Sequence, residues 1–396
     1  MGNFAAFKPS VTDMLNYTEL LEKNEWISLS VLIFFTIVIL FNYLWYYSRL
    51  AFGSQKKIKQ DDSLKQPVSV VICARNEYDN LEKNLPLILE QDYPIFEVIL
   101  VNDFSEDESY FLLKSLSEKY NYLKVVNLRE NVNFFEGKKL ALAVGIKSAR
   151  YENILLTDAD CKPAGRNWIK SMMAAFDEKT EIVLGYGPYS KTKGLLDKLI
   201  RFDTITIAMQ YLGYALAGKP YMGVGRNLAY KKDLFFKSGG FTSHYKISSG
   251  DDDLFINKAA NKRNTRVAID PESFTISEPK RTFSGWFKQK KRHLSTGKYY
   301  KISDKLRLGL LALSNTMFYI TLIVFLAIAQ SSLSLYVALA VFLVKLLTQL
   351  LIFYYAGKKL KEAKLFLYSP ILDVIFAFLN PVFAISNLFY RKNKWK

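Results

Sequence analysis

Two carboxylates separated by one residue follow a short apolar run near the middle of the chain. Ile154, Leu155 and Leu156 form the run, and Asp158 and Asp160 come shortly after it. Residues i and i+2 of an extended backbone project to the same side, so both carboxylates can address one site. Their hard oxygen atoms suit Mg²⁺ or Mn²⁺, which usually keeps open positions for substrate phosphates. The alternative is a polar turn after a strand, because the D-x-D pattern is short.

Acidic residues also follow two earlier strand-like runs. VSVVICA (68–74) is followed by Glu77, and FEVILVND (96–103) ends at Asp103. Ligands of a parallel α/β sheet bind outside the carboxyl ends of its strands, so Glu77 and Asp103 belong to the same edge as the D-x-D pair. Packed carboxylates cost free energy unless a cation neutralises them. Acidic residues at three strand ends therefore favour a site for a cation and phosphates over a simple turn.

A lysine pair opens an expected helix on the same side of the sheet. The free N–H groups after Gly137, together with Lys138, suit a phosphate, although lysines at a helix start are often only solvated.

The chain has no G-x-x-x-x-G-K-[ST] and no G-x-G-x-x-G pattern. A P-loop nucleotide site and a Rossmann dinucleotide site are therefore not expected.

Three adjacent carboxylates form a second acidic group, at Asp251, Asp252 and Asp253. A helix N-terminus favours acidic residues through its dipole, which accounts for one of the three. The functional interpretation is that one of them is a general base, whose pKa is raised by burial and by its neighbours.

A basic segment, WFKQKKRH (286–293), precedes the last apolar part of the chain. Gln289, Arg292 and His293 share one helical face, and Arg292 suits a diphosphate leaving group. The alternative is a basic helix that lies on a membrane surface. Both interpretations hold together if Lys288, Lys290 and Lys291 face lipid while the other face meets the site.

Strands and helices alternate between residues 67 and 190, which predicts a mostly parallel sheet with helices on both faces. The β-branched runs predict strands, and the spacing of leucines and alanines predicts helices. Ser105 is the expected N-cap of the second helix. The expected strands are 68–74, 96–103, 123–128 and 153–158, and the expected helices are 79–91, 105–119 and 137–149.

Long apolar segments predict a membrane protein. Residues 26–47, 308–330 and 333–355 are long enough to cross a hydrocarbon core of roughly 30 Å, and Lys345 is their only charged residue. We expect Lys345 to face protein or water. A further apolar segment, 365–389, contains Asp373 and an Asn380-Pro381 break, and it could span or return as a helical hairpin. The basic tail, 391–396, belongs in the cytoplasm, which favours the re-entrant hairpin over a fourth span.

The charge distribution orients the chain in the membrane. Lys and Arg crowd the segments after the first span, before the second and after the third, which predicts that residues 51–307 lie in the cytoplasm. The net charge of +17 then indicates contact with anionic lipid and phosphates rather than with nucleic acid. The two cysteines, Cys73 and Cys161, imply neither a disulfide framework nor a zinc site.

Across residues 67–300 the chain resembles the family 2 glycosyltransferases of the GT-A fold. It is most similar to the membrane-embedded group that includes cellulose, hyaluronan and poly-N-acetylglucosamine synthases and ceramide glucosyltransferase. The segments VSVVICARNE, VILVNDFSED, GKKLAL and LLTDAD carry this resemblance, in the order that the family uses. It implies an α/β GT-A domain in the cytoplasm, joined to transmembrane helices of the plasma (inner) membrane.

The resemblance also implies a role for each candidate residue. Glu77 and Asp103 would contact the nucleotide base and ribose, and Lys138 would lie on the nucleotide side. Asp158 and Asp160 match the D-x-D that holds the sugar diphosphate and an Mg²⁺ or Mn²⁺ ion. The family's general base falls on Asp252, with Asp251 as the alternative. Its Q-x-x-R-W motif falls on Gln289, Arg292 and His293.

The last of these matches departs from the family, because His293 stands where processive synthases have Trp. The membrane part is also small for a polysaccharide channel. We therefore expect inverting transfer of single sugars from a nucleotide-sugar, with UDP as the carrier, to a lipid-linked or membrane-proximal acceptor. The alternatives are a processive synthase and a non-catalytic membrane scaffold.

The expected organisation follows from the spans and the resemblance together. It comprises an extracytoplasmic segment 1–25, a transmembrane helix 26–50, a catalytic domain 51–285, an interfacial basic helix 286–307, a membrane region 308–390 with two spans plus a hairpin or third span, and a basic tail 391–396.

Overall fold

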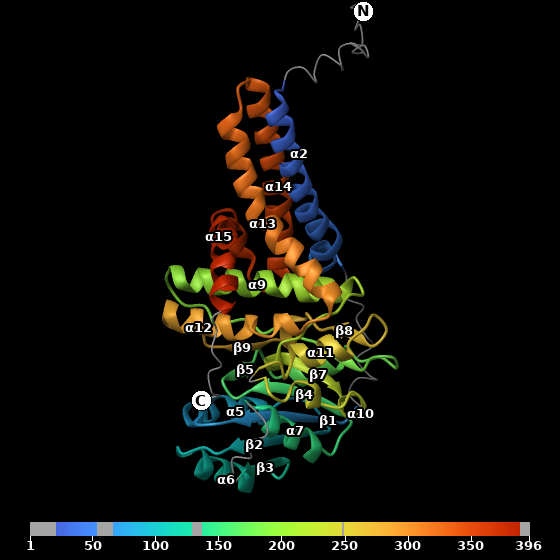
Figure 1. Ribbon diagram of the computed structural model, residues 1–396. Helices are drawn as coiled ribbons and strands as arrows, with labels where there is room; N and C mark the ends of the chain where they lie inside the picture. The colour runs from blue at the N-terminus through green and yellow to red at the C-terminus, as the bar shows by residue number, and fades with distance from the viewer. Residues whose placement is uncertain (1–20, 54–65, 129–136, 248, 389–396) are drawn as a thin grey trace, which may run out of the picture.

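A sheet domain and a helical bundle make up the molecule, and two helices lie between them (Figure 1). The computed structural model describes residues 21–53, 66–128, 137–247 and 249–388. Most of the segment expected at 1–25, the lysines that follow the first span and the tail expected at 391–396 lie outside the described residues.

The described residues form a seven-stranded sheet in the order β3-β2-β1-β4-β7-β6-β8. Its first four strands run parallel, as their β-branched runs predict, and β7 runs antiparallel to both of its neighbours. The strands are β1 Val68–Ala74, β2 Phe96–Asp103, β3 Leu123–Leu128, β4 Asn153–Asp158, β6 Ile182–Leu184, β7 Leu228–Lys231 and β8 Thr265–Val267, with β5 Cys161–Pro163 pairing β9 Thr275–Ser277 in a separate small sheet.

Both faces of the sheet are covered by helices. Val70 and Ile72 of β1 pack into one core and Val71 into the other, so the strand is apolar throughout rather than alternating. One core includes residues of α5 and α8, and the other includes residues of α7. The helices of this domain are α5 Tyr78–Leu89, α6 Ser109–Lys119, α7 Lys139–Ser148, α8 Trp168–Met173, α10 Lys232–Lys237 and α11 Asp253–Ala259, with short turns η2 Gly225–Asn227, η3 Thr242–His244 and η4 Pro271–Ser273.

The prediction that Ser105 caps the second helix was wrong. Phe104 adopts a left-handed conformation with φ 55°, which turns the chain before a helix can begin. The Ser105 hydroxyl instead accepts a hydrogen bond from the Asn76 backbone N–H at 3.0 Å. Ser105 therefore ties the end of β2 to the end of β1.

Four helices of the described residues are long and apolar enough to cross a membrane. The first continues from α2 through a π-helical turn into α3, and three more follow the sheet domain. Their bounds are α2 Lys23–Phe41, η1 Asn42–Tyr47, α3 Ser48–Phe52, α13 Ile302–Ile328, α14 Ser332–Lys359 and α15 Ser369–Leu388, and a short turn, η6 Ala363–Leu367, joins the last two helices.

The hairpin favoured for residues 365–389 does not form, because α15 runs as one helix through Pro381. A proline removes the N–H that would bond to the carbonyl four residues earlier. That carbonyl belongs to Ala377, and it accepts a hydrogen bond from the Thr316 hydroxyl of α13 at 2.7 Å. The neighbouring helix thus satisfies the group that the proline leaves without a donor.

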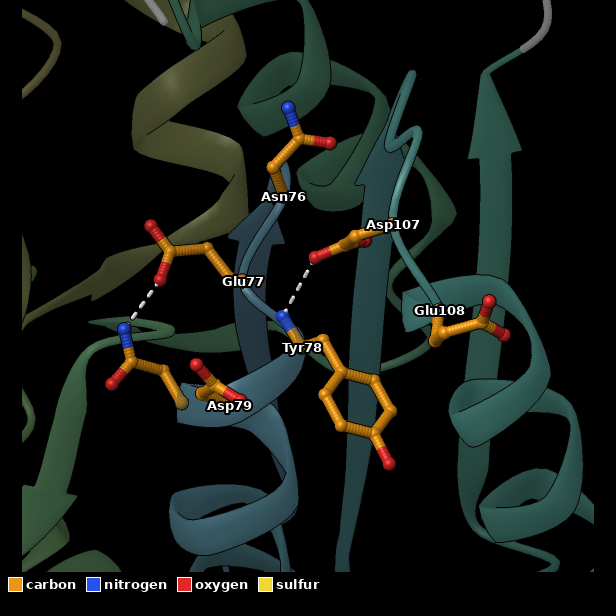
Figure 2. A pocket seen from close by; sticks show the side chains of 7 residues that line it. Asn76, Glu77, Tyr78, Asp79, Asp107 and Glu108 are labelled. Carbon is orange, nitrogen blue, oxygen red and sulfur yellow. Dashed lines mark hydrogen bonds between the residues drawn. The ribbon is translucent and has the colours of Figure 1, made fainter.

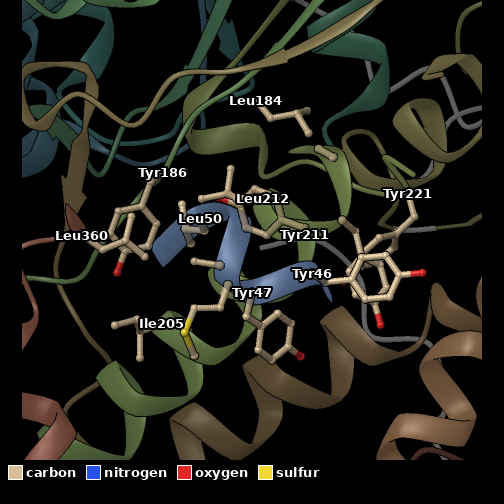
Figure 3. Close-up of a cluster of buried hydrophobic side chains, with 14 of the residues drawn as sticks. Tyr46, Tyr47, Leu50, Leu184, Tyr186, Ile205, Tyr211, Leu212, Tyr221 and Leu360 are labelled. Carbon is tan, nitrogen blue, oxygen red and sulfur yellow. The ribbon is translucent and has the colours of Figure 1, made fainter. Parts of the chain in front are cut away.

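Helix α9, Leu195–Leu216, lies between the sheet domain and the bundle (Figure 1) and contacts both. The Tyr211 hydroxyl donates to the Gly185 carbonyl next to β6 at 2.7 Å, and the Tyr214 hydroxyl donates to Asn42 in the first span at 2.6 Å. Figure 3 shows aromatic and aliphatic side chains from both parts around α9. This helix therefore fixes the sheet domain against the bundle.

Candidate active site

Lys138 joins two acidic groups that are far apart in the sequence. Its Nζ lies 2.8 Å from Asp158 Oδ1, at the end of β4, and 3.1 Å from Asp251 Oδ2, just before α11. Burial alone would lower the pKa of Lys138, but Asp158, Asp251 and Asp252 together raise it well above its ordinary value. Lys138 therefore remains charged and holds the acidic groups at one site.

Asp252 is the N-cap of α11 and has both carboxylate oxygens fixed. Its Oδ1 accepts a hydrogen bond from the Asp253 N–H at 2.7 Å, and its Oδ2 accepts one from the Gly225 N–H at 2.7 Å. Burial, followed by the charges of Asp251 and Asp253, raises the pKa of Asp252 to about 7. This carboxyl group can therefore gain or lose a proton near neutral pH.

The two neighbours of Asp252 have different surroundings. Burial opposes ionisation of Asp251, but the charges of Lys138 and Lys139 lower its pKa below the ordinary value. Asp253 accepts hydrogen bonds from the Tyr300 hydroxyl at 2.6 Å and from the Thr296 hydroxyl. Asp251 thus balances the lysines, and Asp253 ties α11 to the segment before α13.

Asp158 and Asp160 lie close enough to hold one cation. Ligand atoms of these two residues and of Cys161 all lie within 4.8 Å of one another. Asp160 reaches solvent, yet desolvation by the surrounding protein and the charge of Asp158 raise its pKa. Burial raises the pKa of the Cys161 thiol well above its ordinary value, so the thiol stays protonated. The two carboxylates remain as hard ligands, and a divalent cation would relieve their repulsion.

Glu77 lines a pocket of about 310 Å³ at the ends of β1 and β2 (Figure 2). Its carboxylate accepts a hydrogen bond from the Asn80 amide at 2.6 Å. Burial raises the pKa of Glu77, and the nearby charges of Asp160 and Asp158 raise it further. Glu77 therefore lies near the D-x-D pair, as the sequence predicts. The pocket is lined by Asn76, Glu77, Tyr78, Asp79, Asn80, Asp107 and Glu108.

Asp103 is buried at the end of β2, next to the same strand edge. Burial raises the pKa of its carboxyl group, and the Arg75 guanidinium lowers it in part. Asp103, Glu77, Lys138 and the D-x-D pair thus all lie where parallel strands end, which is the binding edge of such sheets.

The three residues of the Q-x-x-R-W match lie on α12, Phe283–Leu294. Gln289 donates to the Tyr189 hydroxyl at 3.2 Å, and the Arg226 guanidinium lies over the Tyr189 ring at 4.5 Å. His293 reaches solvent, yet desolvation by the surrounding protein and the charges of Arg292 and Arg226 lower its pKa, so its imidazole is neutral at pH 7. Arg292 and His293 lie in the exposed last turn of the helix.

The prediction that Lys290 faces lipid was wrong. Its side chain is buried, and its Nζ lies 2.5 Å from Asp203 of α9. The helix packs one face against α15, and Lys290 lies on that buried side, so only Lys288 of that lysine set is exposed. The segment expected as a single helix at 286–307 is also divided, because α12 ends at Leu294 and α13 begins at Ile302, with a short turn, η5 Gly297–Tyr299, between them.

Arg226 and Lys280 belong to the site but were not predicted. Both are among the cations whose charges lower the pKa of Asp160. The Arg226 carbonyl accepts hydrogen bonds from the hydroxyls of Thr157 and Thr275, at 3.0 and 2.7 Å. The sequence signal was the polar segment GVGRN, in which Arg226 is the charged residue.

Comparison with known proteins identifies one domain of the chain. Residues 69–239 match the domain described as Glycosyl transferase family 2. The chain carries a family 2 glycosyltransferase domain. The chain is 27% identical over 241 residues to the probable glycosyltransferase YdaM of Bacillus subtilis, with 59% of this chain and 55% of that protein covered. It is 23% identical over 266 residues to the poly-β-1,6-N-acetyl-D-glucosamine synthase of Staphylococcus aureus (strain MSSA476), with 66% of this chain and 62% of that protein covered.

The chain thus spans less than two thirds of the length of either relative. Among solved structures, it is similar to a mannosyltransferase from Pyrobaculum calidifontis in complex with GDP-Man and Mn²⁺, with a TM-score of 0.55, 20% identity, and coverage of 88% of this chain and 99% of the other. The predicted family 2 domain and the GT-A-like fold are confirmed, and the names of the relatives support the glycosyltransferase class.

Proposed function

We propose that this glycosyltransferase moves a sugar from a nucleotide-sugar to a membrane-proximal or lipid-linked acceptor, with inversion at the anomeric carbon. The observation that carries the proposal is the bridge from Lys138 to Asp158 and Asp251. It brings the D-x-D pair and a carboxylate with a pKa of about 7, Asp252, to one place. Donor binding and proton removal both need such groups within reach of the same sugar.

Asp252 is the general base of the proposed reaction. It takes the proton of the acceptor hydroxyl, whose oxygen forms a bond to the anomeric carbon. The bond from that carbon to the diphosphate oxygen breaks in the same step, and the nucleoside diphosphate leaves with the electron pair. One displacement inverts the anomeric carbon, so the enzyme itself needs no covalent intermediate.

Positive groups of the site stabilise the departing diphosphate. Lys138 is paired with Asp158. Arg226 lies close enough to Asp160 for its charge to lower the pKa of that carboxyl group. Arg292 lies on the exposed last turn of α12, from which a long side chain reaches a ligand. Asp158 and Asp160 would hold Mg²⁺ or Mn²⁺, which neutralises phosphate charge when it is bound.

The nucleotide itself belongs in the pocket at the ends of β1 and β2. Its volume, about 310 Å³, is at the small end of small-molecule sites. Glu77 and Asp103 are the proposed base and ribose contacts. UDP is the proposed carrier, following the family resemblance.

The membrane helices support a membrane-proximal acceptor. Helices α9 and α12 lie between the sheet domain and the bundle (Figure 1), so the site residues on α12 lie on the side of the sheet domain that faces the bundle. The lysine- and arginine-rich segments that flank the spans orient the sheet domain to the cytoplasm of an inner membrane.

A processive polysaccharide synthase is the second candidate. It is favoured by the relative named poly-β-1,6-N-acetyl-D-glucosamine synthase. His293 and the small bundle argue for single transfer instead, because processive synthases of this group have Trp at that position. Product length separates the candidates: a ladder of oligosaccharides indicates polymerisation, and one added sugar indicates single transfer.

Nucleoside diphosphate release by the full chain in lipid vesicles tests the proposal. Each of a panel of nucleotide-sugars is offered with Mn²⁺, Mg²⁺ or EDTA, with and without a total lipid extract. The proposal predicts release from one donor that requires the metal and rises with the lipid extract. Absence of release and of nucleotide binding with every donor would leave the scaffold interpretation.

A further inference from the structure

A polar cluster lies inside the helical bundle, away from the site. Lys345 of α14 is 2% exposed, and its Nζ contacts Asp373 Oδ2 of α15. The same Nζ lies 2.9 Å from the Tyr319 hydroxyl of α13 and 2.7 Å from Gln349 Oε1. Tyr319 also donates to Asp373 at 2.6 Å. Three helices therefore meet at one ion pair.

Stability alone does not explain a buried ion pair in a membrane bundle. Removing two charges from water costs free energy that their attraction often does not repay. Lipid tails are as apolar as leucine side chains, so apolar contacts alone determine the placement of α15 only weakly. A charge pair with two further hydrogen-bond partners has a single well-satisfied arrangement. The cluster therefore fixes where α15 lies against α13 and α14.

Helix α15 also supports α12, with which it is in contact (Figure 1). The Trp286 ring of α12 packs against Phe376 and Phe383 of α15, at centroid distances of 6.1 and 5.5 Å. Phe287 packs against Phe383 at 4.9 Å. A shift of α15 would therefore displace α12, and with it the Gln289 contact to Tyr189.

We propose that Lys345 and Asp373 form a positioning pair that sets α15 and, through it, the placement of α12 at the active site. This inference rests on the role given to α12 in the proposed function. The proposed base and ribose contacts, Glu77 and Asp103, lie with Lys138 on the sheet domain and do not depend on α15. Arg292 of α12, in contrast, acts on the diphosphate as it departs. Breaking the pair should therefore slow transfer while donor binding stays intact.

Kinetics of the full-length protein in lipid vesicles test the proposal. Asp373→Asn and Lys345→Met should each lower kcat by about tenfold or more, because a displaced site residue costs this much. The dissociation constant of the nucleotide-sugar, measured by calorimetry, should stay within about twofold, because its base and ribose contacts lie on the sheet domain. A tenfold change would correspond to about 1.4 kcal/mol of binding free energy. The exchange Lys345→Asp with Asp373→Lys restores an ion pair and should recover most of kcat. Lys358→Met, an exposed change on the same helix, is the control.

A milder variant keeps the test decisive if the single charge variants fail to fold. Tyr319→Phe keeps both charges and removes one hydroxyl, and it should lower kcat by about fivefold, the value of one hydrogen bond. Unchanged kcat in Asp373→Asn would overturn the inference. If the charge variants do not fold, unchanged kcat in Tyr319→Phe would overturn it. A loss of donor affinity that parallels the loss of kcat would also overturn it. Absence of transfer by the unaltered protein would instead refute the proposed function.

Discussion

The backbone N–H of Gly225 donates to Asp252 Oδ2 at 2.7 Å, which joins the turn before β7 to the start of α11. A Cβ at Gly225 would lie 3.3 Å from that oxygen and 3.4 Å from Lys138 Nζ. The absence of a side chain at this position therefore lets the proposed base and its neighbouring lysine approach the backbone.

Gly225→Ala should lower kcat by about tenfold, because a small displacement of a reacting group is costly. The added methyl group must push the Asp252 carboxylate away by a few tenths of an ångström. Steady-state kinetics on the identified donor measure the effect. Gly297→Ala is the matched control, since its Cβ would meet nothing within 4 Å. Equal losses in both variants would show that the close approach does not matter.

Asp252→Asn should leave donor affinity unchanged and lower kcat by about 10²- to 10⁴-fold, the contribution of a general base. The amide keeps the shape of the carboxyl group but cannot accept the acceptor's proton. Calorimetry gives the donor affinity, and single-turnover kinetics give the rate. Asp233→Asn, which changes an exposed carboxylate paired with Lys237, is the control. Near-normal turnover of Asp252→Asn would remove Asp252 from the base role.

The pKa of about 7 at Asp252 predicts a pH dependence. A base must be deprotonated to act, so kcat/KM should rise with pH up to about 7 and then level off. Below that pH it should fall about tenfold per unit. A profile that stays flat between pH 5 and 7 would contradict this assignment.

Asp160→Ala should abolish the part of donor binding that requires Mn²⁺ or Mg²⁺. The remaining carboxylate, Asp158, is already bonded to Lys138, so it cannot hold the ion alone. Titration of the nucleotide-sugar with Mn²⁺ and then with EDTA measures this difference. If the variant still bound the donor more tightly with Mn²⁺ than with EDTA, the cation would lie elsewhere.

Lys290→Met should destabilise the protein by about 3 to 5 kcal/mol, because it leaves Asp203 buried without its partner. A thermal unfolding curve in detergent measures the loss. Replacing both residues, with Asp203→Leu added, should recover much of it. Lys288→Met on the exposed face of the same helix should change little, and an equal effect there would argue against the buried pair.

The parallel strands could be predicted because β1, β2 and β4 are short β-branched runs, each followed by polar residues. The D-x-D pair and the Asp251–Asp253 group were recognisable for the same reason, as they interrupt apolar or neutral sequence. The bridge through Lys138 was not predictable, since it depends on how the end of β4 meets α11.

Other features depended on partners distant in the sequence. The continuity of α15 through Pro381 requires Thr316 of another helix. The burial of Lys290 requires Asp203 on α9, a helix that the sequence did not predict to lie between the sheet domain and the bundle. Local patterns cannot show such contacts.

Transfer of labelled sugar from the identified donor to the lipid phase tests the central claim most directly. Vesicles with the unaltered chain, Asp252→Asn or Asp233→Asn would be compared with Mn²⁺ present. The account predicts label in the lipid phase for the unaltered chain and Asp233→Asn, and none above background for Asp252→Asn. Equal labelling by all three proteins would contradict the assignment of the active site to the cluster around Lys138.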